Sequence, residues 1–539
     1  MKVAELVGRT LAELGVGTAF GVVGSGNFEA TNGLRAGGVR FVAARHEGGA
    51  ASMADAYARM SGRVSVLSLH QGVGLTNALT GITEAAKSRT PMIVLSADTA
   101  ASAVLSNFRI DQDALATAVG AVPERVHGPA TAIADTVRAY RAAWQQRRTV
   151  LLNLPLDVQA HEAHEAPEAI PVPEIPGPAP IRPDRQAVAK LADLLAGARR
   201  PVFIAGRGAR ESSAPLRELA EVSGALLATS AVAHGLFQGD PFSLGISGGF
   251  SSPAAADLIG SADLVIGWGC ALNRWTTRHG TLLGPDARLV QVDVDQAALG
   301  AHRPIALGVV GDVTSTAADV HAELGTRGHG AERPRIPATS WNDVPYDDLS
   351  GNGRIDPRTL SRRLDEILPE ERVVSIDSGN FMGYPSAYLS VPDENGFCFT
   401  QAFQCVGLGL GTAIGAALAR PDRLPVLGVG DGGFHMAISE LETAVRLRIP
   451  LVVVVYNDAA YGAEIHHFGA ADMTTVRFPD TDIAAIGRGF GCDGVTVRSA
   501  GDLAAVTDWL GGPRDAPLVI DAKIADDGGS WWLAEAFRH

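Results

Sequence analysis

Short, continuously apolar runs alternate along the chain with stretches of helical periodicity. Clear examples are Val64–Leu69, Met92–Ala97 and Leu451–Tyr456. Strands this apolar, separated by helices, are typical of parallel sheets that helices cover on both faces. The first residues, MKVAELVGRTLAELGV, have helical spacing and no continuous apolar centre, so they predict the first helix of the fold and not a signal peptide. We therefore expect an α/β fold.

Two stretches interrupt this alternation and divide the chain. The segments His161–Arg185 and Gly325–Pro357 are rich in Pro, Gly and charged residues and cannot hold a regular element for long. The three blocks that remain each repeat the alternation of strand and helix. The sequence thus predicts three doubly wound parallel-sheet domains in series, over residues 1–160, 186–325 and 355–539.

Length, composition and charge exclude several classes of protein. At 539 residues the chain is too long for one hydrophobic core, and 46% apolar with 19% charged residues is a globular composition. The formal net charge of −14 argues against a general nucleic-acid binder, because phosphate neutralisation needs clustered Lys and Arg. Four scattered cysteines without a CxxC pair indicate a reduced, cytoplasmic protein, and no apolar run is long enough to predict a membrane span.

The most informative stretch is GDGGFHMAISELETAVRLRIPLVVVVYND, from Gly430 to Asp458. An apolar strand ends at Gly430, helical spacing runs over Phe434–Arg448, Pro450 ends that helix, and a second apolar strand follows. This order predicts a right-handed crossover with the two strands parallel and close together. The Gly-Asp-Gly and Asn-Asp sequences then lie at the carboxyl ends of nearby strands, facing the crevice where open α/β sheets bind ligands.

The residue types at this edge favour a metal diphosphate. Glycines let backbone N–H groups approach a ligand closely, and a helix N-terminus favours an anion; the glycines concerned are Gly430, Gly432 and Gly433. The side-chain oxygens of Asp431 and Asp458 suit a hard cation such as Mg²⁺, which takes its other ligands from phosphate oxygens and water. A Gly-Asp-Gly tripeptide alone is usually a turn, so the prediction depends on its spacing to Asn-Asp.

That spacing resembles the cofactor motif of the thiamine diphosphate (ThDP) enzymes. The resemblance implies that Asp431, Asp458 and the backbone carbonyl of Ala460 hold the metal. The chain departs from the family at one position, because Asp458 stands where the family usually has Asn. An extra carboxylate remains a good Mg²⁺ ligand, and it could tighten metal binding or shift the preference toward Ca²⁺ or Mn²⁺.

A second match lies near the N-terminus, in FVAARHEGGAASMADAYARMSG (Phe41–Gly62). It resembles the start of a helix in the acetolactate synthase branch of the family, where an Arg-His-Glu sequence supplies the catalytic glutamate. The resemblance implies that Glu47 is this residue and that its buried carboxyl group shares a proton with the cofactor's aminopyrimidine, which activates the cofactor. The structural alternative is an acid in the first turn of a helix, favoured by the helix dipole.

Other segments resemble cofactor-binding parts of the same family. The segment Gln401–Ala416 resembles the one that bends the cofactor. The resemblance implies that Val406 supports the bend and that the Gln404 carbonyl accepts a hydrogen bond from the 4′-amino group; plain core packing is the alternative for Val406. It also implies cofactor contacts from Asn380, in the sequence DSGN, and from Tyr461.

The middle block resembles the central domain of acetolactate synthases and of their flavin-containing relatives. Its sequence GWGCALNRWTTRHG loosely resembles a flavin-binding segment, in which Arg274 or Arg278 could meet a phosphate. FAD binding is left open, because many members of the family lack it.

Residues expected near the substrate point to two branches of the family. His70 and Ser25 resemble active-site residues of benzoylformate decarboxylase, and a histidine can shuttle protons near neutral pH. Gln112, in IDQDALA, instead resembles the carboligases and benzaldehyde lyase. His467 falls where acetolactate synthases carry a tryptophan that shapes the second-substrate site. The structural alternatives are a buried histidine for His70, turn or cap roles for Ser25 and Gln112, and a solvated helix face for His467.

The resemblance covers nearly the whole chain and implies a ThDP- and Mg²⁺-dependent enzyme acting on carbon–carbon bonds. We expect it to decarboxylate a 2-keto acid, to ligate the resulting acyl group to a carbonyl acceptor, or to do both. Two alternatives stay open: a ThDP C–C lyase acting on 2-hydroxyketones or acyl-CoA adducts, and an inactive cofactor-binding scaffold or regulatory subunit. The family also implies that two chains clasp each cofactor, so that a homodimer is the smallest active unit and a homotetramer is expected. The substrates would be small 2-keto acids or aldehydes.

Overall fold

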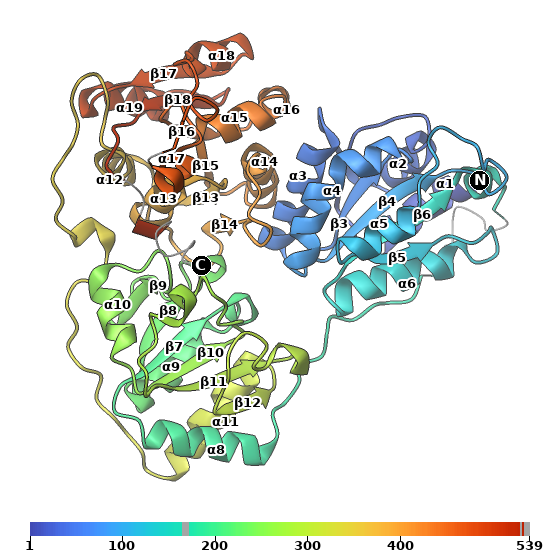
Figure 1. Cartoon of the computed structure of the whole chain (residues 1–539). Coiled ribbons are helices and arrows are strands. Elements are labelled where there is room, and N and C mark those ends of the chain that lie inside the picture. The colour runs from blue at the N-terminus through green and yellow to red at the C-terminus, as the bar shows by residue number, and fades with distance from the viewer. Residues whose placement is uncertain (164–171, 470, 529–530, 533–539) are drawn as a thin grey trace.

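The computed structural model describes residues 1–163, 172–469, 471–528 and 531–532. Within these residues the chain forms three six-stranded sheets, and every strand pair in them is parallel. Figure 1 shows the corresponding three lobes, which we call the N-terminal unit (blue), the middle unit (green) and the C-terminal unit (orange to red). The predicted fold of three doubly wound parallel sheets is confirmed.

The sheet of the N-terminal unit has the strand order β2-β1-β3-β4-β6-β5. Its strands are β1 (Thr18–Gly21), β2 (Arg40–Ala43), β3 (Ser65–Leu69), β4 (Met92–Asp98), β5 (Val122–Arg125) and β6 (Thr149–Pro155). Its helices are α1 (Val3–Glu13), α2 (Phe28–Ala36), α3 (Glu47–Ser61), α4 (Val73–Lys87), α5 (Gln112–Ala118), α6 (Ala132–Gln145) and α7 (Leu156–Ala160). The N-terminal residues thus form a helix, as their spacing predicts.

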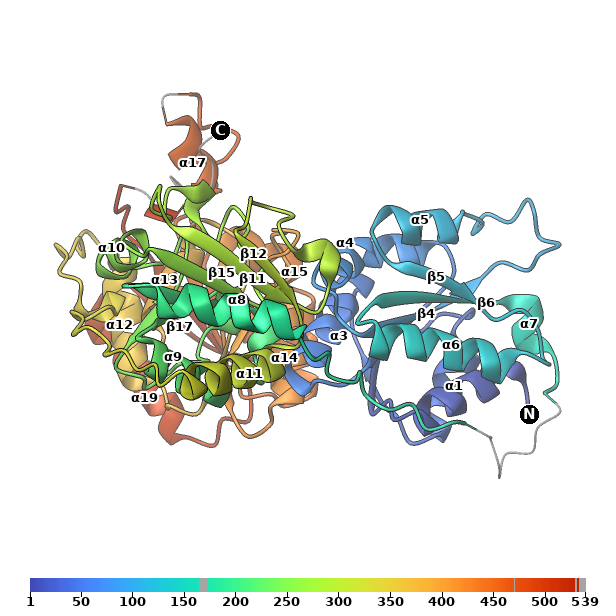
Figure 2. The same ribbon diagram turned by 90° about the horizontal axis from the view of Figure 1, so that it is seen from below.

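The sheet of the middle unit has the order β12-β11-β10-β7-β8-β9. Its strands are β7 (Pro201–Ala205), β8 (Leu226–Thr229), β9 (Ser243–Ile246), β10 (Leu264–Trp268), β11 (Arg288–Asp293) and β12 (Leu307–Val310). Its helices are α8 (Arg185–Ala196), α9 (Ser213–Ser223), α10 (Pro253–Gly260) and α11 (Val313–Thr326). Figure 2 shows α8 and α11 side by side over the sheet, where their apolar residues pack on Phe203 of β7.

The sheet of the C-terminal unit has the order β14-β13-β15-β16-β18-β17. Its strands are β13 (Arg372–Ile376), β14 (Phe397–Phe399), β15 (Leu424–Gly430), β16 (Val452–Asn457), β17 (Asp493–Val497) and β18 (Leu518–Lys523). Its helices are α12 (Pro357–Ile367), α13 (Gly383–Tyr388), α14 (Gly409–Ala419), α15 (Asp431–Ala437), α16 (Glu440–Arg446), α17 (Gly462–Phe468), α18 (Ile483–Gly489) and α19 (Ala504–Gly511).

One predicted helix is wrong in its bounds. The spacing predicts a single helix over Phe434–Arg448, whereas the structure has two shorter helices, α15 and α16. Ile438 and Ser439 keep α-helical backbone angles, but their carbonyl oxygens accept from the third residue onward instead of the fourth. This local 3₁₀-type hydrogen bonding separates the two helices, while the backbone angles stay helical.

The N-terminal and C-terminal units share one apolar core. Buried residues of α3 and α4 pack with buried residues of α14, β15 and α15 in a continuous cluster. The helices α3 and α14 cross very closely, because α14 presents Gly411 and Gly415 to α3. A Cβ atom on Gly415 would lie 2.3 Å from the carbonyl oxygen of Met53, so a larger residue cannot be accommodated there. Figure 1 shows α3 and α14 facing each other between the two lobes.

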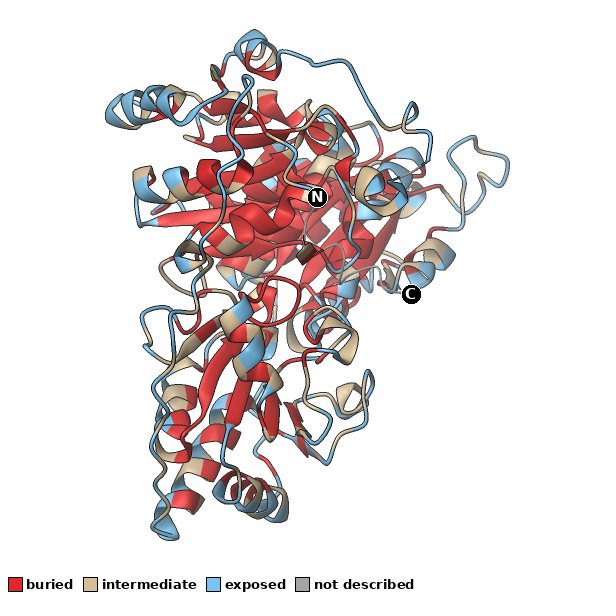
Figure 3. Cartoon of the chain, turned by 60° about the vertical axis from the view of Figure 1, so that its left-hand side comes forward, coloured by how far each residue is buried: buried red, intermediate tan, exposed pale blue. Residues whose placement is uncertain are grey.

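Burial follows the sheets throughout the chain. Figure 3 shows the strands almost entirely buried and the exposed residues on outer helices and loops. Within the part of the chain that the structure describes, no helix is long and apolar enough to cross a membrane.

Candidate active site

Two carboxyl groups meet at the carboxyl edge of the C-terminal sheet. Asp431 directly follows β15, and Asp458 directly follows β16, the strand paired with it. Asp431 is buried and Asp458 nearly so, and their side chains are within hydrogen-bonding reach of each other. Burial raises the pKa of both carboxyl groups, and the negative charge of Asp431 raises the pKa of Asp458 further. Two buried carboxyl groups in contact need a shared proton or a cation.

The glycines beside Asp431 are required by close approach and not by unusual backbone angles. A Cβ atom on Gly433 would lie 2.2 Å from Oδ2 of Asp377, and one on Gly432 would lie 2.8 Å from the ring of Tyr461. The Gly433 position also faces the side chain of Val406 at 3.3 Å. The turn from β15 into α15 therefore brings Val406 and Tyr461, both predicted cofactor residues, next to Asp431.

The segment around Gln404 is held in a specific shape. Gln404 has a left-handed backbone (φ 56°), which is strained for a residue other than glycine. Three and four residues further along the chain, the backbone N–H groups of Gly407 (3.0 Å) and Leu408 (3.3 Å) donate hydrogen bonds to the buried carboxylate of Asp377. Burial raises the pKa of Asp377 to about 6. Val406 is 37% exposed, so plain core packing does not describe its position in this chain.

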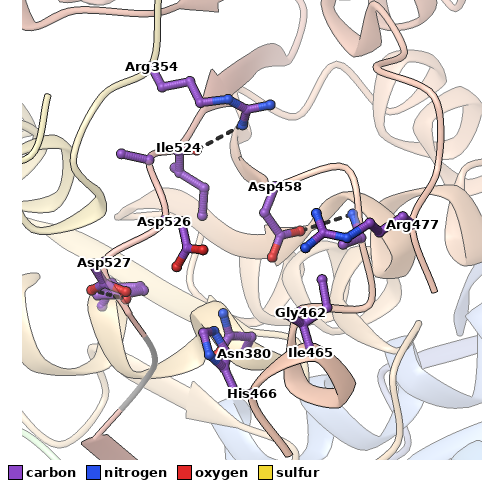
Figure 4. A pocket seen from close by; sticks show the side chains of 13 residues that line it. Arg354, Asn380, Asp458, Gly462, Ile465, His466, Arg477, Ile524, Asp526 and Asp527 are labelled. Atoms are coloured by element: carbon purple, nitrogen blue, oxygen red, sulfur yellow. Dashed lines mark hydrogen bonds between the residues drawn. The ribbon is translucent and has the colours of Figure 1, made fainter. Parts of the chain in front are cut away.

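A pocket of about 240 Å³ lies beside Asp458 and Ala460. Figure 4 shows its lining, which comes from four parts of the C-terminal unit and from the segment that precedes it. Three predicted site residues line it, namely Asn380, Asp458 and Ala460. The lining also includes residues that sequence reasoning missed: Arg354, His466, Arg477, Asp526 and Asp527.

Two neighbouring histidines of α17 lie differently with respect to this pocket. His466 of α17 lines the pocket, whereas His467 is not among the lining residues and its ring lies 6.2 Å from that of Phe468. A half-buried His467 also differs from a fully solvated helix face.

In the N-terminal unit, Glu47 is the first residue of α3, as expected. His46 caps this helix by accepting from the N–H of Gly48 at 2.9 Å, and Glu47 accepts from the amide of Asn77 at 3.1 Å. The side chain of Glu47 is only partly buried in the single chain. The buried setting that the prediction requires is thus not supplied by the N-terminal unit itself.

Ser25 and His70 lie together near the start of α4. The hydroxyl oxygen of Ser25 is 3.5 Å from Nε2 of His70, whose Nδ1 is 2.9 Å from the carbonyl oxygen of Gln71. The ring of His70 meets Phe108 edge-on at 5.1 Å. The amide oxygen of Gln71 is buried beside this cluster and has no hydrogen-bond partner among the described residues.

The geometry of Gln112 fits its structural alternative. The side chain is 2% exposed, and its oxygen accepts from the N–H of Gly72 at 3.0 Å. Its amide nitrogen donates to the carbonyl oxygen of Ala97 and to the side chain of Asn153. Both amide hydrogens are therefore used inside the fold, and the amide oxygen fixes the turn after His70 by accepting from the N–H of Gly72.

The predicted residues form two clusters, one in each terminal unit. The hydrogen bonds described for Ser25, Glu47, His70 and Gln112 all stay within the N-terminal unit. The contacts of Asp431, Asp458 and Val406 described above stay within the C-terminal unit.

Comparison of the chain with known proteins finds matches to three domain profiles of one enzyme family. Residues 1–117 match the family profile described as the thiamine pyrophosphate enzyme N-terminal TPP binding domain. Residues 188–320 match the central domain of the same enzymes, and residues 377–522 match their C-terminal TPP binding domain.

The chain belongs to the thiamine pyrophosphate enzyme family.

Relatives within this family carry different activities in their names. A sulfoacetaldehyde acetyltransferase from Castellaniella defragrans is 30% identical, over 98% of this chain and 92% of its own length. A probable 2-ketoarginine decarboxylase from Pseudomonas aeruginosa is 31% identical over 92% and 89%, and an acetolactate synthase from Mycobacterium bovis is 26% identical over 99% and 90%. A solved structure, the ThDP-dependent 4-hydroxybenzoylformate decarboxylase of Rhodococcus jostii RHA1, shares the fold with a TM-score of 0.84 at 23% identity, over 98% of this chain and all of that one.

The residues of this thiamine pyrophosphate family member fit the cofactor and its metal. Among the described residues no group of three or more His, Cys, Asp and Glu side chains could hold a metal. Two carboxylates and a backbone carbonyl are nevertheless sufficient where phosphate oxygens and water complete the ligands of Mg²⁺. The contact between Asp431 and Asp458 and the small residues beside it match that requirement.

Proposed function

We propose that this chain is a ThDP- and Mg²⁺-dependent enzyme that decarboxylates a 2-keto acid, ligates the resulting acyl group to a carbonyl acceptor, or does both. The buried pair of Asp431 and Asp458 carries the proposal, because it needs a shared proton or a cation, and it lies at the edge of the sheet where the family binds its cofactor. When bound, ThDP supplies a carbon nucleophile for addition to a substrate carbonyl.

Each proposed site residue has a defined role. Asp431, Asp458 and the carbonyl of Ala460 hold the metal, and Asn380, Tyr461 and the glycines Gly430, Gly432 and Gly433 surround the diphosphate. The Gln404 carbonyl and the side chain of Val406 orient the aminopyrimidine. Glu47 holds the proton that this ring exchanges.

The substrate side of the site is proposed to lie in the N-terminal unit. His70, with Ser25 at 3.5 Å, is suited to move a proton to or from a substrate oxygen. Gln112 does not join this pair directly but fixes the turn that follows His70, through the N–H of Gly72.

We infer that two chains complete each site, as the family resemblance implies. Large apolar side chains are exposed in both terminal units of the single chain: Val73, Val104, Leu105 and Phe108 in the N-terminal unit and Val406, Met436, Tyr461 and Phe468 in the C-terminal unit. Exposed apolar side chains in both of the units that carry the proposed site support a protein partner. A homodimer is the proposed minimum and a homotetramer the proposed assembly.

Several finer features remain proposals. The domain bounds 1–160, 186–325 and 355–539 and a cytoplasmic location are retained from the sequence. FAD binding in the middle unit stays open; Arg278 donates to the carbonyl oxygens of Gly248 and Ser251, so Arg274 is the better candidate for a phosphate contact. A ThDP C–C lyase remains the alternative reaction, because it would use the same groups in reverse.

The proposal is tested with purified protein and a panel of 2-keto acids, aldehydes and 2-hydroxyketones, with products identified by mass. EDTA treatment should abolish turnover, and Mg²⁺ together with ThDP should restore it. Conversion of 2-hydroxyketones alone would assign the lyase reaction instead. Tight ThDP binding without turnover of any substrate, and without exchange of the cofactor's C2 proton, would assign a non-catalytic scaffold.

A further inference from the structure

The N-terminal and C-terminal units repeat one arrangement of strands and helices. Their sheets have the same order, β2-β1-β3-β4-β6-β5 in the first and β14-β13-β15-β16-β18-β17 in the last. In this correspondence β2 and α3 match β14 and α14, while β3 and α4 match β15 with α15 and α16. The two units face each other through the equivalent helices α3 and α14. Features of one side of this contact can therefore be sought on the other.

On one side, a carboxylate of the C-terminal unit holds the backbone beside Glu47. Glu440 on α16 is 1% exposed and accepts from the N–H groups of His46 (2.9 Å) and Arg45 (3.2 Å). Its second oxygen accepts from the hydroxyl of Thr443 at 2.8 Å. The two N–H groups belong to the residues that immediately precede Glu47 in the chain.

On the other side, a carboxylate of the N-terminal unit holds the backbone beside Gln404. Glu84 on α4 is also 1% exposed, and it accepts from the N–H groups of Ala402 (3.1 Å) and Phe403 (2.6 Å). Arg59 on α3 donates to the same carboxylate at 2.8 Å. The two N–H groups again belong to residues that immediately precede a proposed site residue.

Burying a carboxylate is unfavourable unless its oxygens are hydrogen-bonded, and charge-assisted bonds to backbone N–H groups are among the strongest. Each carboxylate accepts such bonds from two consecutive N–H groups of the opposite unit. Fixing consecutive N–H groups fixes the backbone itself, and hence where the following residue begins.

We infer that Glu440 and Glu84 are reciprocal positioning residues, Glu440 for Glu47 and Glu84 for Gln404. This inference rests on the proposed function, since it concerns residues assigned to the aminopyrimidine. Neither glutamate touches the reacting atoms. They act by holding the two segments that must meet one cofactor in register.

The test compares Glu440→Gln and Glu84→Gln with Glu442→Gln as a matched control. A glutamine at position 440 keeps one acceptor oxygen for the N–H groups of Arg45 and His46 but loses the negative charge that strengthens both bonds. Glu442 lies on the same helix and pairs with the side chains of Arg45 and Arg446 at the surface, so its substitution removes a charge without touching those N–H groups.

A second variant reaches Glu440 without changing it. A Cβ atom on Gly49 would lie 2.4 Å from Oε1 of Glu440 and within 2.7 Å of two of its carbons. Gly49→Ala should therefore displace the carboxylate while suiting helix α3, because alanine is the better helix former.

Three quantities are measured on each full-length protein: thermal unfolding, the affinity for ThDP with Mg²⁺ by fluorescence titration, and the exchange rate of the C2 proton of bound ThDP by NMR. For Glu440→Gln and Gly49→Ala we expect C2 exchange per folded, cofactor-loaded site to fall about 10- to 100-fold, with ThDP affinity close to wild type. For Glu84→Gln we expect ThDP affinity to fall about tenfold. Glu442→Gln should match wild type in all three quantities.

Normal exchange and affinity per folded protein in all variants, with only a lower unfolding temperature, would overturn the inference and leave the two carboxylates as interface contacts. Losses in Glu442→Gln equal to those in Glu440→Gln would overturn it as well. Wild-type protein that binds no ThDP would instead refute the proposed function, so the two failures are distinguishable.

Discussion

Replacing Asp458 with asparagine should change the stability of the chain in opposite directions with and without metal. In the metal-free protein, two nearly buried carboxyl groups lie within hydrogen-bonding reach at Asp431 and Asp458. Two unit charges about 4 Å apart repel by about 4 kcal/mol at an effective dielectric constant of 20. Near pH 7 a shared proton relieves part of this repulsion, and we take roughly half of it, about 2 kcal/mol, to remain.

The direction in which the stability of the metal-free protein changes with pH follows from the raised pKa values of Asp431 and Asp458. A carboxyl group whose folded-state pKa lies above its unfolded value destabilises the folded protein as pH rises above the unfolded pKa. Metal-free wild type should therefore lose stability between about pH 4 and pH 8. Asp458→Asn removes one of the two charges, so it should raise the unfolding temperature of the metal-free protein by about 4–8 °C at pH 7.5, as 2 kcal/mol gives for a domain of this size.

With Mg²⁺ and ThDP the order should reverse. The variant has one carboxylate ligand fewer, and each tenfold loss of metal affinity removes about 1.4 kcal/mol of ligand-induced stabilisation at saturating ligand. Thermal unfolding followed by circular dichroism in EDTA and in Mg²⁺ with ThDP measures both effects. Asp515→Asn is the control, because Asp515 is exposed in the same unit and the substitution removes the same charge. An unchanged or lower unfolding temperature of Asp458→Asn in EDTA would refute the argument from the buried pair.

Four further outcomes are expected. Glu47→Gln should bind ThDP and Mg²⁺ but lose turnover by about 10²- to 10⁴-fold, and C2-proton exchange as fast as in wild type would show the assignment to be wrong. Sedimentation should find active protein only as a dimer or larger assembly, and a fully active monomer would contradict the shared site. Purified protein with a flavin absorption spectrum would establish FAD binding, and colourless active protein would exclude a requirement for it. Pyruvate alone should give little acetolactate, because a histidine at position 467, where acetolactate synthases carry a tryptophan, would make the second-substrate site more polar. His467→Trp should therefore increase that product; efficient acetolactate formation by the wild type, unaffected by the substitution, would refute this reasoning.

The sheets are predictable from the sequence because fully buried parallel strands have to be apolar at every position. Accordingly β3, β4 and β16 begin and end within one residue of the predicted runs. The division of Phe434–Arg448 into two helices is not predictable, because the apolar spacing continues across Ile438 and Ser439 and only the hydrogen bonding changes. Periodicity reports which face is buried and not which carbonyl accepts which N–H.

Some residues of the candidate site are likewise predictable from the sequence, and others are not. Asp431 and Asp458 are predictable because each directly follows a recognisable strand, and parallel strands end at a common edge. Four of the residues missed around the pocket, Arg354, Arg477, Asp526 and Asp527, lie in or beside isolated bridges between separate segments, Ile355 with Ile524 and Ala460 with Arg477. No local pattern encodes such pairings. Glu84 and Glu440 were missed for a related reason: a glutamate within a helix ordinarily marks a solvated face, and their backbone partners lie more than 300 residues away in the chain.

The single chain leaves both halves of the proposed site unfinished in a complementary way. Glu47 is partly exposed although its task calls for a carboxyl group removed from water, and the buried amide oxygen of Gln71 has no described partner. In the other half, Val406 and Tyr461 present apolar surface to solvent. Covering Glu47 with an apolar surface, and Val406 with the apolar part of a cofactor, would satisfy both halves at once. Assembly of two chains around the cofactor would then create the desolvated acid and the filled pocket in one step, and an isolated chain would lack the environment for proton transfer even though it carries every proposed residue.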